Sequence, residues 1–268
     1  MNITFSASTI AGYAVSGLFM LLLPVTVFII WRKRTHEKLF PTLVGAVIFP
    51  VFALGLKLIP AYPLLYGDNS VSRSINAAPW LYYLTVGLLA GIFEETGRFL
   101  AFRYVLKKYT DRRTSVSYAI GHGGIEALYA GFTTLSFIAL AVIVNSGGID
   151  KVTKDVPAEL MPVAMDKLRE YASMTFGGAV LGMVERVSAM MLQTGLSVLV
   201  FRAVREKKAL WLYPLAIALH AALDFSCIIY TKNHLLFEAV LLLGAAALLF
   251  ITVRFVYRKM PTEKEVSV

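Results

Sequence analysis

The sequence has few charged residues. Asp, Glu, Lys and Arg make up 16% of its 268 residues, whereas 57% are hydrophobic and the mean hydropathy is +0.68. A soluble globular domain carries about 25% charged residues. This composition excludes an ordinary soluble domain and predicts a polytopic membrane protein.

The sequence also has one cysteine only, and it shows neither a signal peptide nor a clear internal repeat. Cys227 is the one cysteine in the sequence, which excludes an intramolecular disulfide. We expect no cleavable signal peptide, because the first apolar run is too long for the hydrophobic part of one and ends in a basic cluster. No repeat indicates the internal symmetry found in many transporters.

Basic residues give the chain a formal net charge of +9, and most of them lie in short segments between apolar runs. In a membrane protein such segments mark the cytoplasmic side and meet anionic lipid headgroups. We therefore expect contact with membrane lipids and no nucleic-acid partner. The alternation of basic and base-poor segments predicts an N-terminus outside and a C-terminus inside.

The apolar runs predict the fold class: a single all-α transmembrane domain over residues 1–268, with about seven membrane-spanning helices. The polar residues that suggest a function lie in the core of this domain, at 80–230. The approximate spans are 9–31, 39–59, 80–104, 115–145, 177–201, 211–230 and 235–257.

Three segments outside these spans have their own character. Residues 60–79 contain prolines and a Gly-Asp-Asn turn, so we expect an extracytoplasmic loop. Residues 146–176 mix acids and bases, and apolar residues recur at helical spacing from Leu160 to Tyr171, which predicts an extracytoplasmic amphipathic helix. Residues 260–268 are polar and are expected to form a flexible cytoplasmic tail.

The third span contains Glu94, Glu95 and Arg98 in an otherwise apolar run. Each charge at a helix centre costs about 2.5–3.5 kcal/mol on insertion scales, and such residues are usually functional. The structural alternative pairs Glu94 with Arg98, four residues apart, and leaves Glu95 over. Adjacent side chains point about 100° apart, so we expect at most one glutamate to face the histidines of other spans.

Other polar residues lie at a similar depth in neighbouring spans. His122 with Glu126 and His220 with Asp224 are each spaced four apart, so each pair projects from one helix face. Gln193 lies at the same depth and is expected to donate a hydrogen bond to a substrate. At a rise of about 1.5 Å per residue, these groups share a slab between the midplane and the cytoplasmic side.

Lys57 and the pair Glu185 and Arg186 lie in spans as well. We expect Lys57 to reach the interface with no chemical role. The Glu185–Arg186 pair lies nearer the outer side, where a structural ion pair is expected.

Two histidines with carboxylates in a membrane cavity are typical of hydrolysis. His122, His220 and Glu126 are a possible zinc ligand set with an open position for water, and a further carboxylate would act as base. Without metal, a glutamate with a histidine can activate water, and Asp224 can orient His220. Two alternatives stay open: a proton-coupled transporter, and a non-catalytic immunity or receptor protein whose cluster only ties helices together.

Three motifs in this order resemble the bacterial YhfC-type intramembrane metalloproteases: EETGR at 94–98, GHGGIE at 121–126 and HAALD at 220–224. That family looks distantly related to the CAAX-protease and bacteriocin-processing (CPBP) superfamily and to PrsW-type proteases. Gln193 stands where some relatives are expected to carry a third histidine.

The resemblance implies a protease of the bacterial plasma membrane that cuts a peptide or membrane-protein substrate in the cytoplasmic half of the membrane. Glu94 or Glu95 would activate water with help from His122, and His220 with Asp224 would stabilise the oxyanion. Arg98, Glu126 and Gln193 would support the substrate or the catalytic groups. The bound metal would be zinc, if one is used.

Overall fold

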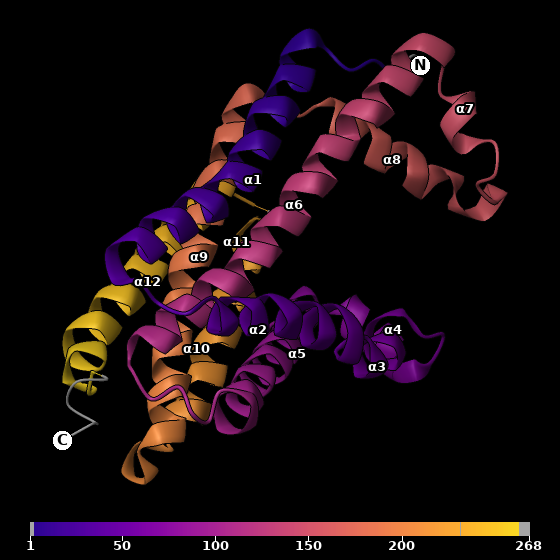
Figure 1. The fold of residues 1–268 in the computed structure, drawn as a ribbon. Helices are drawn as coiled ribbons and strands as arrows, with labels where there is room; N and C mark the ends of the chain where they lie inside the picture. Colours follow the sequence, from indigo (N-terminus) through magenta and orange to yellow (C-terminus); the bar gives the residue numbers. More distant parts are fainter. Residues whose placement is uncertain (1–2, 231, 263–268) are drawn as a thin grey trace. The chain divides into compact units, whose positions relative to one another are not determined.

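The computed structural model describes residues 3–230 and 232–262, and this part of the chain is helical without strands. Six helices are long and apolar enough to cross a membrane. A seventh results if Ser70–Ala77 and Pro79–Val105, which meet at 111°, form one span. The helices, labelled in Figure 1, confirm the predicted all-α membrane protein.

Contacts divide the chain into two compact units. Unit 1 comprises residues 1–23 and 127–186, and unit 2 comprises residues 24–126 and 187–268. Three helices contribute residues to both units: α1 (Ala7–Thr35), α6 (Arg113–Gly147) and α9 (Phe176–Arg205). The single domain stays a prediction. All eight predicted site residues belong to unit 2.

Unit 2 holds the remaining long helices. Its major elements are α2 (Leu39–Phe49), α5 (Pro79–Leu100), α10 (Leu212–Phe225) and α12 (His234–Phe255). Shorter elements are η1 (Pro50–Leu56), α3 (Leu58–Ala61), η2 (Tyr62–Tyr66), α4 (Ser70–Ala77), η3 (Ala101–Val105), η5 (Lys207–Ala209), α11 (Cys227–Tyr230) and η6 (Tyr257–Lys259).

The predicted loop at 60–79 is wrong, because most of it is helical. Pro50 lacks an amide hydrogen, and the second span changes there from an α-helix to the wider π-helix η1, in which the Lys57 amide donates to the Phe52 carbonyl at 3.0 Å. Further along, the Asn69 side chain accepts a hydrogen bond from the Ser72 amide at 3.0 Å and starts α4. The second span therefore changes its helix type at Pro50, and a new helix begins after Asn69, so most of this segment is helical.

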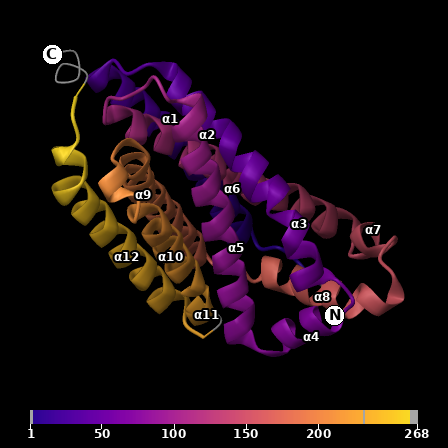
Figure 2. The same cartoon turned by 90° about the horizontal axis from the view of Figure 1, so that it is seen from below.

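Glycines let α5 approach the backbone of α10. A Cβ on Gly91 would lie 2.7 Å from the Ile217 carbonyl oxygen, and one on Gly87 would lie 2.6 Å from that of Ala221. Figure 2 shows α9, α10 and α12 side by side, and a Cβ on Gly195 of α9 would lie 3.0 Å from Leu248 of α12. This packing holds the polar face of α10 against α5.

Unit 1 contains α7 (Asp150–Thr153), η4 (Ala158–Leu160) and α8 (Met161–Ala172). Helix α8 confirms the predicted amphipathic helix, with Leu168 buried in a cluster that includes Phe5 and Tyr13. The expected ion pair between Glu185 and Arg186 is present.

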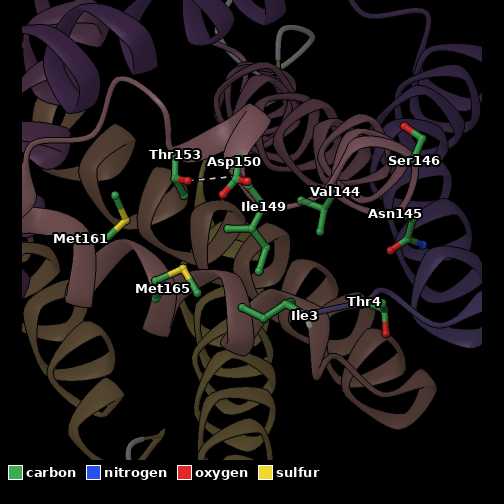
Figure 3. A pocket seen from close by; sticks show the side chains of 11 residues that line it. Ile3, Thr4, Val144, Asn145, Ser146, Ile149, Asp150, Thr153, Met161 and Met165 are labelled. Atoms are coloured by element: carbon green, nitrogen blue, oxygen red, sulfur yellow. Dashed lines mark hydrogen bonds between the residues drawn. The ribbon is translucent and has the colours of Figure 1, made fainter. Parts of the chain in front are cut away.

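A cavity of about 590 Å³ also lies in unit 1, and its lining contains none of the predicted site residues (Figure 3). The flexible tail predicted at 260–268 falls largely at 263–268, outside the described residues.

Candidate active site

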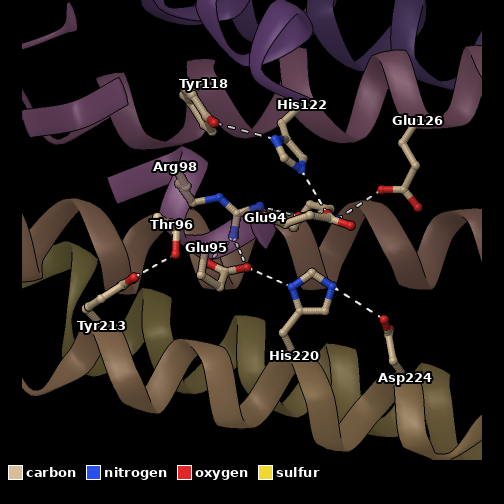
Figure 4. A network of polar contacts seen from close by, with 11 residues as sticks. Glu94, Glu95, Thr96, Arg98, Tyr118, His122, Glu126, Tyr213, His220 and Asp224 are labelled. Atoms are coloured by element: carbon tan, nitrogen blue, oxygen red, sulfur yellow. Dashed lines mark hydrogen bonds and ion pairs between the residues drawn. The ribbon is translucent and has the colours of Figure 1, made fainter. Parts of the chain in front are cut away.

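The two adjacent glutamates of α5 face different helices (Figure 4). Glu94 Oε2 lies 3.2 Å from His122 Nε2 of α6, and Glu95 Oε1 lies 2.7 Å from His220 Nδ1 of α10. The prediction that at most one glutamate faces the histidines is wrong. The histidines lie on two helices beside α5, so the angle of about 100° between the glutamates directs one to each.

Arg98 pairs with Glu95. Its NH1 donates to Glu95 Oε1 at 2.6 Å, and both side chains have 0% exposure. The suggested pairing of Glu94 with Arg98 is therefore wrong, because Glu94 is turned toward α6. A buried charge pair is stable only when hydrogen bonds satisfy its remaining groups, and here His220 adds one to Glu95.

Gln193 of α9 connects the two halves of this network. Its Oε1 accepts a hydrogen bond from Arg98, and its Nε2 donates to Glu94 Oε2 at 3.3 Å and to Glu126 Oε2 at 3.0 Å. The acceptor and donor ends of the amide are thus both engaged, which defines its orientation. The hydrogen bond from Gln193 to a substrate stays a prediction.

His220 is held by Glu95 more closely than by Asp224. The distance from His220 Nε2 to Asp224 Oδ2 is 3.7 Å, longer than a hydrogen bond, against 2.7 Å from Nδ1 to Glu95. Glu95 therefore orients the ring, which was the role expected of Asp224. The Asp224 side chain is 31% exposed and lies at the edge of the network.

Sequence reasoning missed three residues around this network. Tyr118 lies one turn before His122, and its hydroxyl is 3.5 Å from His122 Nδ1. Thr96 of α5 and Tyr213 of α10 join their hydroxyls at 2.8 Å (Figure 4). Spacing gives a signal for two of them, since Tyr118 and Tyr213 lie four and seven residues before the histidines and so share their helix faces.

Lys57 was expected to have no chemical role, yet it lies within electrostatic range of Glu94 and Asp224. It directly follows the π-helix η1. Such segments often occur at functional sites. The role of Lys57 stays a prediction.

The arrangement does not present a ready metal site. Within residues 3–230 and 232–262, no three His, Cys, Asp or Glu side chains form a group able to hold a metal ion. His122 Nε2 and His220 Nδ1 each contact a carboxylate, and Glu126 accepts from Gln193. Zinc held by His122, His220 and Glu126 stays a prediction.

These observations define a multi-pass membrane protein with buried acids, histidines and an arginine inside its spans. Comparison with known proteins gives the family: the model of the YhfC intramembrane metalloprotease family matches residues 19–243. The chain belongs to this family.

One relative is the "Uncharacterized membrane protein YhfC" of Bacillus subtilis (strain 168). It is 32% identical over 232 residues, which cover 85% of this chain and 87% of that protein. No solved structure matches the chain.

Proposed function

We propose that this protein is an intramembrane endopeptidase of the bacterial plasma membrane, in which Glu94 activates water to hydrolyse a peptide bond of a peptide or membrane-protein substrate. One observation carries the choice of Glu94 over Glu95. The Glu94 side chain is 7% exposed, and both His122 and Gln193 contact its Oε2. Glu95 is 0% exposed, and both its oxygens contact Arg98. An oxygen of Glu94 is therefore available to water.

The reaction needs one base that later acts as an acid. Glu94 takes a proton from water as the water oxygen bonds to the substrate carbonyl carbon, and the carbonyl electron pair moves to oxygen. The oxyanion then re-forms the carbonyl, the carbon–nitrogen bond breaks, and the amine leaves with the proton from Glu94. General acid–base catalysis of this kind contributes about 10²–10⁴-fold to the rate.

The histidines take different parts in this scheme. His122 contacts Glu94 and orients its carboxylate. His220 donates its Nδ1–H to Glu95, and in the imidazolium form the Nε2–H near Asp224 donates to the oxyanion. Arg98 and Glu95 hold His220 in this orientation through the buried pair.

A base test uses one isosteric variant of Glu94 and one isosteric surface control. In membranes from cells that produce Glu94→Gln, we expect new peptide N-termini, measured by mass spectrometry, to fall about 10²–10⁴-fold against wild type. Glu170→Gln changes an exposed acid paired with Lys167 at 2.7 Å and should leave cleavage unchanged. Wild-type cleavage by folded Glu94→Gln would refute Glu94 as the base.

The family description names a metalloprotease, so metal content is measured on the same preparations. The side chains in this arrangement do not fit a metal site with three protein ligands, and the proposed reaction uses no metal ion. About one zinc per wild-type chain, lost in both His122→Ala and His220→Ala, would support the predicted ligand set. Full cleavage by zinc-free protein would refute it.

A further inference from the structure

Aromatic side chains close the site on the side of the basic loops. Phe102 and Tyr118 have ring centroids 4.7 Å apart, and Phe102 and Phe201 have centroids 5.1 Å apart. Their exposed fractions are 0%, 0% and 1%, respectively. Each ring lies further toward the basic loops than a polar residue of the same span. Phe102, in η3 directly after α5, lies beyond Glu94; Tyr118 of α6 lies beyond His122; and Phe201 of α9 lies beyond Gln193. We call these three rings the aromatic seal.

Charged side chains lie on the opposite side of the network. Glu126 follows His122 by one turn of α6, and Asp224 follows His220 by one turn of α10. Figure 4 shows both carboxylates at the same end of the network, on two helices. Glu126 is half-buried and the Asp224 side chain is 31% exposed, whereas His122 and His220 are buried. We call this pair of carboxylates, Glu126 and Asp224, the mouth.

The backbone changes at the mouth as well. Helix α10 ends at Phe225, directly after Asp224, and its membrane span continues through Ser226 into α11 up to Tyr230. Lys57 directly follows the π-helix η1 of its own span. Charged groups and irregular backbone inside a membrane are tolerated where they are buried in protein or line a water-filled space. The mouth has partly exposed charged groups, whereas the three rings of the aromatic seal are buried.

From this asymmetry we infer that the substrate reaches Glu94 through the mouth, from the side of the membrane opposite the basic loops. This inference rests on the proposed function and reverses the direction of access that a cytoplasmic cavity implies. The basic loops predict a cytoplasmic seal, so the mouth faces the extracytoplasmic half. The substrate class is a polypeptide segment that is unwound in that half of the membrane or beyond it.

An unwound segment fits the mouth for a physical reason. A transmembrane helix satisfies its own peptide groups, and its carbonyls are closed to attack by water. Unwinding exposes those peptide groups, which are costly in lipid but find polar partners and water between Glu126 and Asp224. A soluble cytoplasmic peptide would have to pass the aromatic seal.

Cysteine accessibility tests this route without any cleavage assay. Replacing Cys227 by Ser gives a chain without cysteine. In that background, Asp224→Cys and Glu126→Cys report on the mouth, and Thr114→Cys, one turn beyond Tyr118 and 0% exposed, reports on the sealed side. Exposed reference positions are Lys208→Cys in a basic loop and Lys232→Cys in the opposite loop.

The probe is the membrane-impermeant trimethylammonium methanethiosulfonate, added to sealed vesicles of either orientation. We expect Asp224→Cys or Glu126→Cys to react from the side that labels Lys232→Cys, at least tenfold faster than from the other side. Thr114→Cys should react from neither side. Labelling of the mouth from the Lys208 side, or of Thr114→Cys, would overturn the inference. The expected labelling without any cleavage would instead refute the proposed function alone.

Discussion

Replacing Arg98 by Met should destabilise the protein far more than breaking a surface ion pair of the same length. Arg98 and Glu95 have 0% exposure, so the variant leaves a buried carboxylate with His220 as its remaining close partner. Gln193 Oε1 loses its donor too. Removing one member of a buried pair costs about 3–5 kcal/mol, and we expect the free energy of unfolding to fall by this amount.

The chain provides a matched control. Arg73 and Asp68 are also joined at 2.6 Å, but their side chains are 68% and 95% exposed. Exposed pairs contribute about 0–1 kcal/mol, so Arg73→Met should change stability little. Both variants are unfolded with increasing sodium dodecyl sulfate in mixed micelles, and helix content is followed by circular dichroism.

A double-mutant cycle separates the pair from the loss of packing. Glu95→Gln together with Arg98→Met removes both charges and leaves no unpaired buried carboxylate, so we expect the double variant to cost less than Arg98→Met alone, with a coupling of at least about 2 kcal/mol. A loss below about 1 kcal/mol for Arg98→Met, or additive single costs, would show that the pair is hydrated or broken in the membrane.

Three further predictions concern contacts that stabilise each of the two units. Gly91→Ala should lower the free energy of unfolding by about 1–3 kcal/mol, because the new Cβ would lie 2.7 Å from the Ile217 carbonyl oxygen. In the same detergent titration Gly177→Ala should be neutral, because the nearest atom to its new Cβ lies at 3.8 Å. Thr96→Val and Tyr213→Phe should each cost about 1 kcal/mol, and the double variant about as much as either single variant, since they share one hydrogen bond; additive costs would contradict it. Asn145→Ala removes two hydrogen bonds of 2.8 Å to the Phe5 backbone, so limited proteolysis should cut the N-terminal segment faster than in the control Ser146→Ala. Equal rates would show that Asn145 does not hold this segment.

The helices and the depth of the polar residues were predictable for a simple reason. A span requires a long apolar run, and each residue advances about 1.5 Å, so sequence position converts to depth. His122, His220 and Gln193 therefore fall near the glutamates as expected. The resemblance of the motifs to a known family was confirmed by the family match.

The partners of each side chain were not predictable, because apolar runs do not reveal how helices rotate about their axes. Arg98 is three residues from Glu95 and four from Glu94, and both spacings allow an ion pair. The choice depends on α6 and α10, which draw the glutamates to opposite sides. The change of the second span from α-helix to π-helix at Pro50 was not predicted, because a proline-rich segment is equally typical of a loop.

The glycine contact between α5 and α10 has a mechanical consequence. Helices that meet through side chains can slide when bilayer thickness changes, because long side chains adapt their rotamers. Here Gly87 and Gly91 set main chain against main chain, so sliding would drive carbonyl oxygens into the opposing helix. The contact between Glu95 and His220 should therefore keep its length in thin and thick bilayers alike. In the proposed function, lipid composition would then act by moving the peptide bond relative to Glu94, and not by deforming the contact between Glu95 and His220.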